Sequence, residues 1–280
     1  MQNRPQTIGI IGGTGAMGRM FEPLFRADGY AVLIAGRRTE LTYEALAERA
    51  DVVIVTVPIE STADAIRRVA PRMGPRQLLT DFTSVKAEPV RAMLASQASV
   101  IGCHPVFGPV ADPKGQNVVL CPARPGSFLP WFRGWFESHG MHVEEMDAAA
   151  HDRAMGMIQG LLHFVNVSYA RTLQQSGVSA ADLYQVSSPI YRIFFSTLAR
   201  ILGGDPALYG AIQTQNPDSR LAVRTFLREA EQVLAGIEHD DPARFIAAFQ
   251  EAARYLGKTG QEASADSAWL IQNPRPRDKT

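Results

Sequence analysis

The stretch "IGIIGGTGAMGRMF", residues 8–21, places a glycine-rich turn between an apolar run and a helical pattern. Gly13, Gly15 and Gly18 within it have the spacing G-x-G-x-x-G. In this motif the first glycine permits a tight turn, the second lets the backbone approach a pyrophosphate, and the third lets helix and strand pack closely. The N-terminus of the following helix attracts the phosphates. We therefore expect a dinucleotide to be bound by Gly13, Thr14, Gly15, Ala16, Met17 and Gly18.

Short apolar runs alternate with helical patterns through the first half of the chain. Several of these runs are apolar at consecutive positions, as in strands buried on both faces of a parallel sheet. The alternation predicts βαβ units and a doubly wound α/β fold. The predicted strands are residues 7–12, 31–35, 51–58, 77–82, 99–102, 117–122 and 142–146.

The second half of the chain has helical patterns and no strand patterns. We therefore expect a Rossmann-type dinucleotide-binding domain over residues 1–147 and an all-helical substrate-binding and dimerisation domain over residues 148–280. The helices of the second half have many apolar faces, but this half is too small to bury them all in a core of its own. This favours a homodimer that pairs the helical domains of two copies.

Composition limits the class of protein. The chain has 280 residues, 46% of them hydrophobic and 20% charged, and a formal net charge of zero. This balance favours neither nucleic acid nor a membrane surface as a partner. Cys103 and Cys121 give neither a disulfide framework nor metal-ligand spacing, and the sequence has neither a cleavable signal nor a run of about 20 apolar residues. We expect a cytoplasmic protein without a metal.

The end of the second predicted strand bears on the choice of dinucleotide. An acidic residue at this point would bind the ribose 2′-hydroxyl of NAD, but the sequence has Arg37 and Arg38. Two guanidinium groups suit the extra phosphate of NADP, so NADP is favoured over NAD. Val57 and Pro58 end the third predicted strand and are expected to contact the cofactor.

Polar residues also follow the fourth and fifth predicted strands. Ser84 and Lys86 come after the fourth strand, and His104 comes after the fifth. Ligands of open α/β sheets bind beyond the carboxyl ends of the strands. Pro105 disfavours a helical conformation at His104, so we expect this imidazole to face the nicotinamide pocket.

Four segments together resemble the prephenate dehydrogenase family. They are "DFTSVK" (81–86), "GCHPVFGP" (102–109), "HDRAMGMIQGLLHF" (151–164) and "SSPIYRIFFSTLARILGGDPALY" (187–209). The resemblance runs from about residue 7 to about residue 255, and the last segment is similar to the branch fused to chorismate mutase. We expect no mutase segment before the glycine turn and no regulatory domain after the helices.

The resemblance implies an oxidative decarboxylation. A hydride leaves C4 of prephenate for NAD(P), the C4 hydroxyl loses its proton, and carbon dioxide departs to give 4-hydroxyphenylpyruvate, as in tyrosine biosynthesis. His104 matches the catalytic histidine that accepts from the hydroxyl, and Ser84 would orient His104 or the hydroxyl. A near-neutral pKa suits this task.

The resemblance also implies a set of substrate contacts. Many relatives carry a second histidine three positions before His163, where this chain has Gly160. The other four histidines beyond His104 and His163 are interpreted as surface or structural residues: His139, His142, His151 and His239. The expected substrate-binding residues are Arg200, which would bind a carboxylate, His163, Lys86, Arg192 and Gln159.

Three alternatives stay open. The substrate could be arogenate or 4-amino-4-deoxyprephenate, and Asp112 is a residue that could meet the ammonium of arogenate. A β-hydroxyacid or 6-phosphogluconate type of dehydrogenase would need a lysine in the helical half, and the first lysine there is Lys258. A non-catalytic dinucleotide-sensing protein would not need His104.

Overall fold

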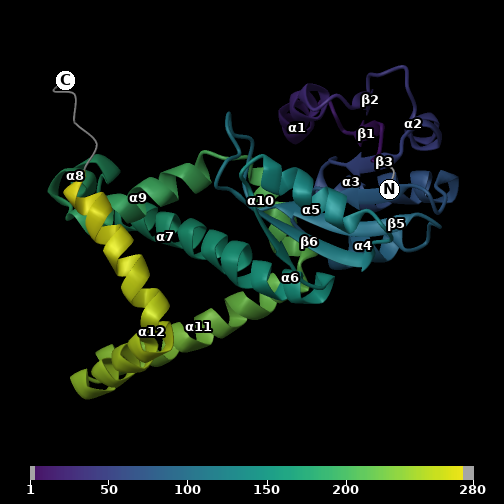
Figure 1. The fold of residues 1–280 in the computed structure, drawn as a ribbon. Helices are drawn as coiled ribbons and strands as arrows, with labels where there is room; N and C mark the ends of the chain where they lie inside the picture. Colours follow the sequence, from purple (N-terminus) through teal and green to yellow (C-terminus); the bar gives the residue numbers. More distant parts are fainter. Residues whose placement is uncertain (1–3, 274–280) are drawn as a thin grey trace. The chain divides into compact units, whose positions relative to one another are not determined.

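The computed structural model describes residues 4–273, which form two compact units (Figure 1). The sheet unit contains the described residues up to Gly160 together with Ala207–Arg220. The helical unit contains Leu161–Pro206 and the described residues from Leu221 onward. The predicted division after residue 147 differs from this one, since the sheet unit extends to Gly160 and regains Ala207–Arg220.

The sheet unit is built on one seven-stranded sheet, and each strand corresponds to one of the predicted runs. The strand order is β2-β1-β3-β4-β5-β6-β7. The first five strands are parallel, β6 is antiparallel to β5, and β7 is parallel to β6. The strands are β1 (Thr7–Ile11), β2 (Ala31–Ala35), β3 (Val52–Val55), β4 (Leu78–Asp81), β5 (Ser99–Pro105), β6 (Asn117–Arg124) and β7 (His142–Glu145).

Strands β3 and β4 are buried along their whole length, which explains their consecutive apolar residues. Two apolar clusters form the core of the unit, as expected for a sheet covered on both faces. The helices of this unit are α1 (Ala16–Ala27), α2 (Tyr43–Arg49), α3 (Ile59–Val69) with the 3₁₀ turn Ala70–Arg72, α4 (Ala87–Met93), α5 (Leu129–Ser138), α6 (Ala148–Met155) and α10 (Pro206–Gln215).

Helix α6 packs against β6 and α4, so it belongs to the sheet unit and not to the helical one. Asp147 caps its N-terminus by accepting a hydrogen bond of 2.7 Å from the backbone N–H of Ala150. A π-helix, Gly156–Leu161, follows α6 directly.

The helical unit is formed by α7 (Leu162–Ser176), α8 (Ala180–Val186), α9 (Pro189–Leu202), most of α11 (Pro217–Glu238) and α12 (Pro242–Gln272). Helix α9 packs against α7, α8 and α12. Ser188 caps α9, and Gly177 ends α7 in the left-handed conformation with φ of 70°. Within residues 4–273, no helix is long and apolar enough to span a bilayer.

Candidate active site

The glycine turn joins β1 to α1, and its glycines are required by close backbone contacts. Gly12 has φ of 84°, and a Cβ there would lie 2.7 Å from the carbonyl oxygen of Thr56. Gly12 takes the positive φ of the turn, and a hydrogen bond of 2.8 Å from the backbone N–H of Gly15 to the carbonyl oxygen of Gly12 closes it around Gly13. A Cβ on Gly18 would lie 2.4 Å from Cα of Gly13, so the third glycine permits the close packing that the motif predicts.

The N-terminus of α1 is open to a ligand. Gly15 is the N-cap residue and provides no side-chain hydrogen bond, and Thr14, Gly15 and Ala16 are exposed. Backbone N–H groups in a first helical turn without a capping side chain bind anions well. The turn therefore fits the pyrophosphate of a dinucleotide.

The end of β2 lies beside this turn. A Cβ on Gly36 would be 3.0 Å from Oγ1 of Thr14. Arg37 and Arg38 follow in an exposed turn, which is held by a hydrogen bond of 2.8 Å from the backbone N–H of Gly36 to Oγ1 of Thr39. Both guanidinium groups are thus on a loop adjacent to the expected phosphate site.

The end of β3 lies on the other side of the glycine turn. Cγ1 of Val57 lies 3.0 Å from where a Cβ on Gly12 would be, and Pro58 is the exposed N-cap residue of α3. Because β1 and β3 are neighbours while the chain visits β2 between them, this is the switch point where ligands of such sheets bind.

His104 is held near the end of β5, and 2% of its surface is exposed. The strand is longer than predicted because β6 pairs with it as far as Pro105, with His104 opposite Val119. The last pair between β4 and β5 is Asp81 with Gly102. His104 thus lies beyond β4 at the carboxyl edge of the parallel strands.

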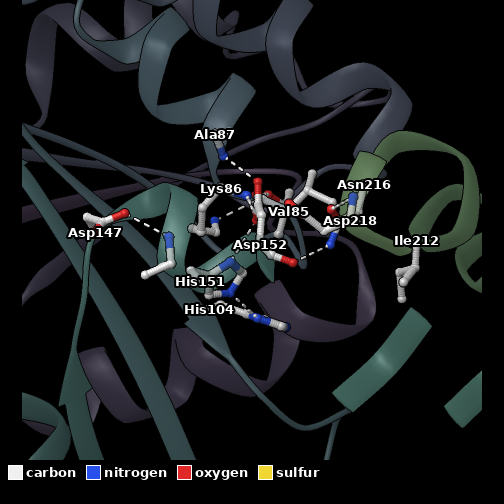
Figure 2. A network of polar contacts seen from close by, with 12 residues as sticks. Val85, Lys86, Ala87, His104, Asp147, His151, Asp152, Ile212, Asn216 and Asp218 are labelled. Carbon is white, nitrogen blue, oxygen red and sulfur yellow. Dashed lines mark hydrogen bonds and ion pairs between the residues drawn. The ribbon is translucent and has the colours of Figure 1, made fainter. Parts of the chain in front are cut away.

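Two further buried side chains, His151 and Asp152, continue in a line from His104 (Figure 2). Nδ1 of His104 lies 2.8 Å from Nε2 of His151, and Nδ1 of His151 lies 2.8 Å from Oδ1 of Asp152. The carboxylate of Asp152 also accepts hydrogen bonds of 2.8 Å from the backbone N–H groups of Lys86 and Ala87. Helix α6 therefore connects the β5 histidine to the start of α4.

Burial keeps both imidazoles neutral. It lowers the pKa of His104 well below the usual range, and His151 and Lys86 lower this pKa further. Burial also lowers the pKa of His151, although the hydrogen bond to Asp152 acts in the opposite direction. For Asp152, burial alone would raise the pKa, but the hydrogen bonds from His151, Ala87 and Lys86 bring it below its ordinary value.

Lys86 has a different environment from the predicted one. Its side chain is fully buried and forms an ion pair with Asp81, and Nζ donates a hydrogen bond of 2.9 Å to the carbonyl oxygen of Cys103. The ammonium is therefore occupied within the protein and is not available to a substrate carboxylate. Instead, Lys86 fixes the backbone of β5 one residue before His104.

Ser84 lies in the segment between β4 and α4 and is half-buried. The N-cap residue of α4 is Lys86, so Ser84 does not cap that helix. Its position at the carboxyl end of β4 agrees with the edge on which His104 lies.

Gln159 lies in the π-helix, where the backbone hydrogen bonds join residues i and i+5. His163 lies on the following helix, α7, so the two expected substrate-binding residues belong to different helical segments. At Gly160 the absence of a side chain has a local reason, because a Cβ would lie 2.3 Å from Oγ of Ser219.

The remaining predicted substrate residues belong to the helical unit. His163 is buried on α7, and burial lowers its pKa. Arg192 on α9 donates a hydrogen bond of 3.1 Å to Oγ of Ser187, and its guanidinium lies 5.5 Å from the ring centroid of Tyr184. Arg200 is exposed near the end of α9.

His151 is the site residue that the sequence interpretation missed. It was grouped with surface or structural histidines, yet it is fully buried and contacts His104. The sequence did contain a signal. Asp147 is a good N-cap residue, so a helix is expected to begin directly after it, and in that helix His151 shares a face with the apolar Met155, one turn later.

Comparison with known proteins identifies the family of the chain. Residues 33–127 match the family model "Prephenate dehydrogenase, nucleotide-binding domain", and residues 147–251 match "Prephenate dehydrogenase, dimerization domain". The T-protein of Haemophilus influenzae is 33% identical over 95% of this chain and 71% of its own length. A protein of Methanocaldococcus jannaschii named "Probable arogenate/prephenate dehydrogenase" is 32% identical, over 94% of this chain and 64% of its own length.

A solved structure has the same fold. Prephenate dehydrogenase from A. aeolicus, in complex with hydroxyphenyl propionate and NAD⁺, superposes with a TM-score of 0.70 at 19% identity, covering 91% of this chain and 98% of that one. Both halves of the chain match the two domain models in the expected order. The chain therefore belongs to the prephenate dehydrogenase family of oxidoreductases.

Proposed function

We propose that the protein catalyses the oxidative decarboxylation of prephenate with transfer of a hydride to a nicotinamide dinucleotide. The observation that carries the proposal is a neutral, buried imidazole whose Nδ1 is occupied by His151. This leaves Nε2 of His104 to accept a hydrogen bond from the C4 hydroxyl of the substrate. Family membership supplies the reaction type.

In this reaction His104 first accepts a proton from the substrate and later returns it. As the hydride leaves C4 for the cofactor, the hydroxyl proton moves toward Nε2 of His104 and a C4 carbonyl develops. When the bond from C1 to the carboxylate breaks, its electron pair enters the ring and the C4 oxygen takes a proton back. The product is a phenol, so the hydroxyl proton is borrowed and returned.

The substrate carries two carboxylates, and arginine binds carboxylates in bidentate geometry. Arg200 is the preferred partner, since it is exposed and makes no ion pair with another described residue. Arg192 is already engaged by Ser187 and Tyr184 and is a weaker candidate. Gln159 and His163 are proposed to complete the substrate contacts, and Ser84 to orient the hydroxyl.

The dinucleotide is proposed to be NADP in preference to NAD. Gly13, Gly15 and Gly18 shape the turn for the pyrophosphate, and Arg37 and Arg38 supply positive charge where the 2′-phosphate would be. When bound, the cofactor supplies the hydride acceptor. The chain's own residues hold it and orient it.

The helical unit is proposed to pair with a second copy. Large apolar side chains are exposed on its last two helices, among them Leu221 (63%), Phe249 (68%) and Tyr255 (89%). Large apolar side chains exposed in this number favour an interface, because their burial against a second copy would remove apolar surface from water. Light scattering during size exclusion should give the mass of a dimer, and the mass of one chain would contradict this part of the proposal.

The function is tested by mixing the purified protein with substrate and cofactor and following the absorbance of reduced nicotinamide. Prephenate, arogenate and 4-amino-4-deoxyprephenate are each combined with NAD and with NADP, because Nε2 of His104 accepts equally from a hydroxyl or an amine. The proposal expects the highest kcat/KM with prephenate and NADP. The absence of reduction with all six pairs would contradict the enzymatic function.

A further inference from the structure

The hydrogen-bond acceptors in the row His104, His151 and Asp152 determine which nitrogen of each imidazole carries a hydrogen. Asp152 is a carboxylate and only accepts, so Nδ1 of His151 must carry the hydrogen between them. His151 is neutral, which leaves its Nε2 as an acceptor. Nδ1 of His104 must then be the donor across the 2.8 Å contact, and Nε2 of His104 has a lone pair.

We propose that His151 and Asp152 are positioning residues that hold His104 in this tautomer and take over the positive charge while His104 keeps the substrate's proton. The inference rests on the proposed function and deepens it. It extends the site from one histidine to a relay of three side chains, from β5 into α6.

The relay step is balanced. As Nε2 of His104 takes the proton from the C4 hydroxyl, the bond between Nδ1 and its hydrogen breaks and a new bond forms from that hydrogen to Nε2 of His151. His104 stays neutral, and the positive charge rests on His151 beside the carboxylate of Asp152. Both proton transfers reverse when the C4 oxygen is reprotonated, so the relay neither gains nor loses a proton over the reaction.

The surroundings explain why the positive charge should move from His104 to His151. A cation on His104 would lie in a fully buried position, where both burial and Lys86 oppose it. His151 faces Asp152 on its own helix, and its pKa is raised by Asp81 at the end of β4 and lowered by Lys86 at the start of α4. Of the two imidazoles, only His151 has a carboxylate as its hydrogen-bond partner, which makes it the better site for the charge.

Asp152 is itself held rigidly, as a positioning residue must be. Two backbone N–H groups at the start of α4 bind its carboxylate, and Nδ2 of Asn216 donates a hydrogen bond of 2.8 Å to its backbone carbonyl (Figure 2). These contacts restrict both oxygens of the carboxylate. The fold of the sheet unit therefore holds Asp152 as the acceptor for His151.

Asp152→Asn tests the relay through the pH profile of kcat. The amide can donate to Nδ1 of His151 and reverse both tautomers, so kcat at the optimum should fall by about 100-fold or more. Because Asp152 favours the charged form of His151, its loss should also move the acidic limb of the profile to lower pH by about one unit. A purely structural role would lower kcat or the melting temperature without moving the limb.

Asp64→Asn is the matched control, since it removes one carboxylate from an exposed position of the same unit. It should leave both kcat and the acidic limb unchanged. An Asp152→Asn protein with wild-type kcat, or with reduced kcat and an unmoved limb, would overturn the proposal.

Nitrogen NMR of the resting wild-type protein tests the relay independently of turnover and of any variant's folding. The imidazole ¹⁵N shifts should show Nδ1 protonated and Nε2 unprotonated in both His104 and His151. A proton on Nε2 of His104 would overturn the relay even in an active enzyme. Conversely, the predicted tautomers in a protein that oxidises none of the substrates would retain the relay geometry and reject the proposed function.

Discussion

The imidazole rings of His104 and His151 meet edge to face inside the sheet unit, with centroids 5.0 Å apart and planes at 69°. One ring comes from β5 and the other from α6, 47 residues further along the chain. The contact occupies one nitrogen of His104 and leaves the other for a ligand. His104 is thus a buried residue with one nitrogen held by the protein, which is the arrangement that the proposed acceptor role requires.

His104→Asn should separate chemistry from cofactor binding. Asparagine cannot serve as the base, so kcat is expected to fall by about 100-fold to 10,000-fold. The dissociation constant for NADP, measured by fluorescence titration, should stay within about twofold, because phosphate binding lies at the glycine turn. His142→Asn, on the exposed start of β7, serves as the control. Unchanged turnover of His104→Asn would favour the dinucleotide-sensing alternative.

Gly18→Ala should weaken both folding and dinucleotide binding. The new methyl group would lie 2.4 Å from Cα of Gly13, a backbone atom that cannot move aside without opening the turn. Overpacking of this kind costs about 1–3 kcal/mol in the free energy of unfolding. Gly134→Ala is the control, because a Cβ on this α5 glycine meets nothing within 4 Å. Denaturant unfolding of both variants makes the comparison, and equal stabilities would refute the packing argument.

Replacing both Arg37 and Arg38 by alanine should abolish the preference for NADP. Each charge-assisted hydrogen bond contributes about 1.5–3 kcal/mol, so KM for NADP should rise by about 10-fold or more. KM for NAD should change little, since NAD lacks the 2′-phosphate. Steady-state kinetics with both cofactors decide this. A wild-type protein that already prefers NAD would show that these arginines have another role.

Arg200→Ala should raise KM for prephenate and leave KM for the cofactor unchanged. Loss of a bidentate contact to a carboxylate corresponds to about 10-fold to 100-fold in affinity. Arg254→Ala on α12 is the control, because Arg254 is another exposed arginine of the helical unit. If the two variants have the same KM for prephenate, Arg200 does not bind the substrate.

Stability should fall as the pH is lowered below about 6.5, the ordinary pKa of histidine. His104, His151 and His163 all have folded pKa values below this point. The unfolded chain therefore binds protons that the folded chain does not bind. The free energy of unfolding falls by about 1.4 kcal/mol per pH unit for each histidine until the pH reaches the folded pKa of that histidine. Asp152 adds a further loss at more acidic pH, since its folded pKa is also lowered.

Thermal melts between about pH 8 and pH 5 measure this slope. His151→Phe removes one of the three buried imidazoles and should make the slope shallower. His142→Phe removes an exposed histidine and should retain the wild-type slope. A melting temperature that does not change over this range would contradict the prediction that these groups are neutral in the folded protein.

The sequence by itself determined the α/β sheet, the glycine turn and the family. Buried parallel strands require consecutive apolar residues, and the dinucleotide turn requires glycines at fixed spacing, so both leave a local record. The position of His104 at the carboxyl edge of the sheet was also predicted from local signals, because an apolar run that ends in His-Pro is typical of a strand end. The expected sheet and the expected helical half are both present.

Only the tertiary structure decided which polar groups meet. Lys86 pairs with Asp81 inside the protein, and His151 joins His104 to Asp152, although in the sequence both look like ordinary polar residues. The return of Ala207–Arg220 to the sheet unit was equally invisible. These contacts join residues far apart in the chain, and the pairing of a buried charge depends on the partner that the fold brings to it. The physical reason is burial: once water is excluded, each polar group must find its partner across the fold, and local sequence does not record that choice.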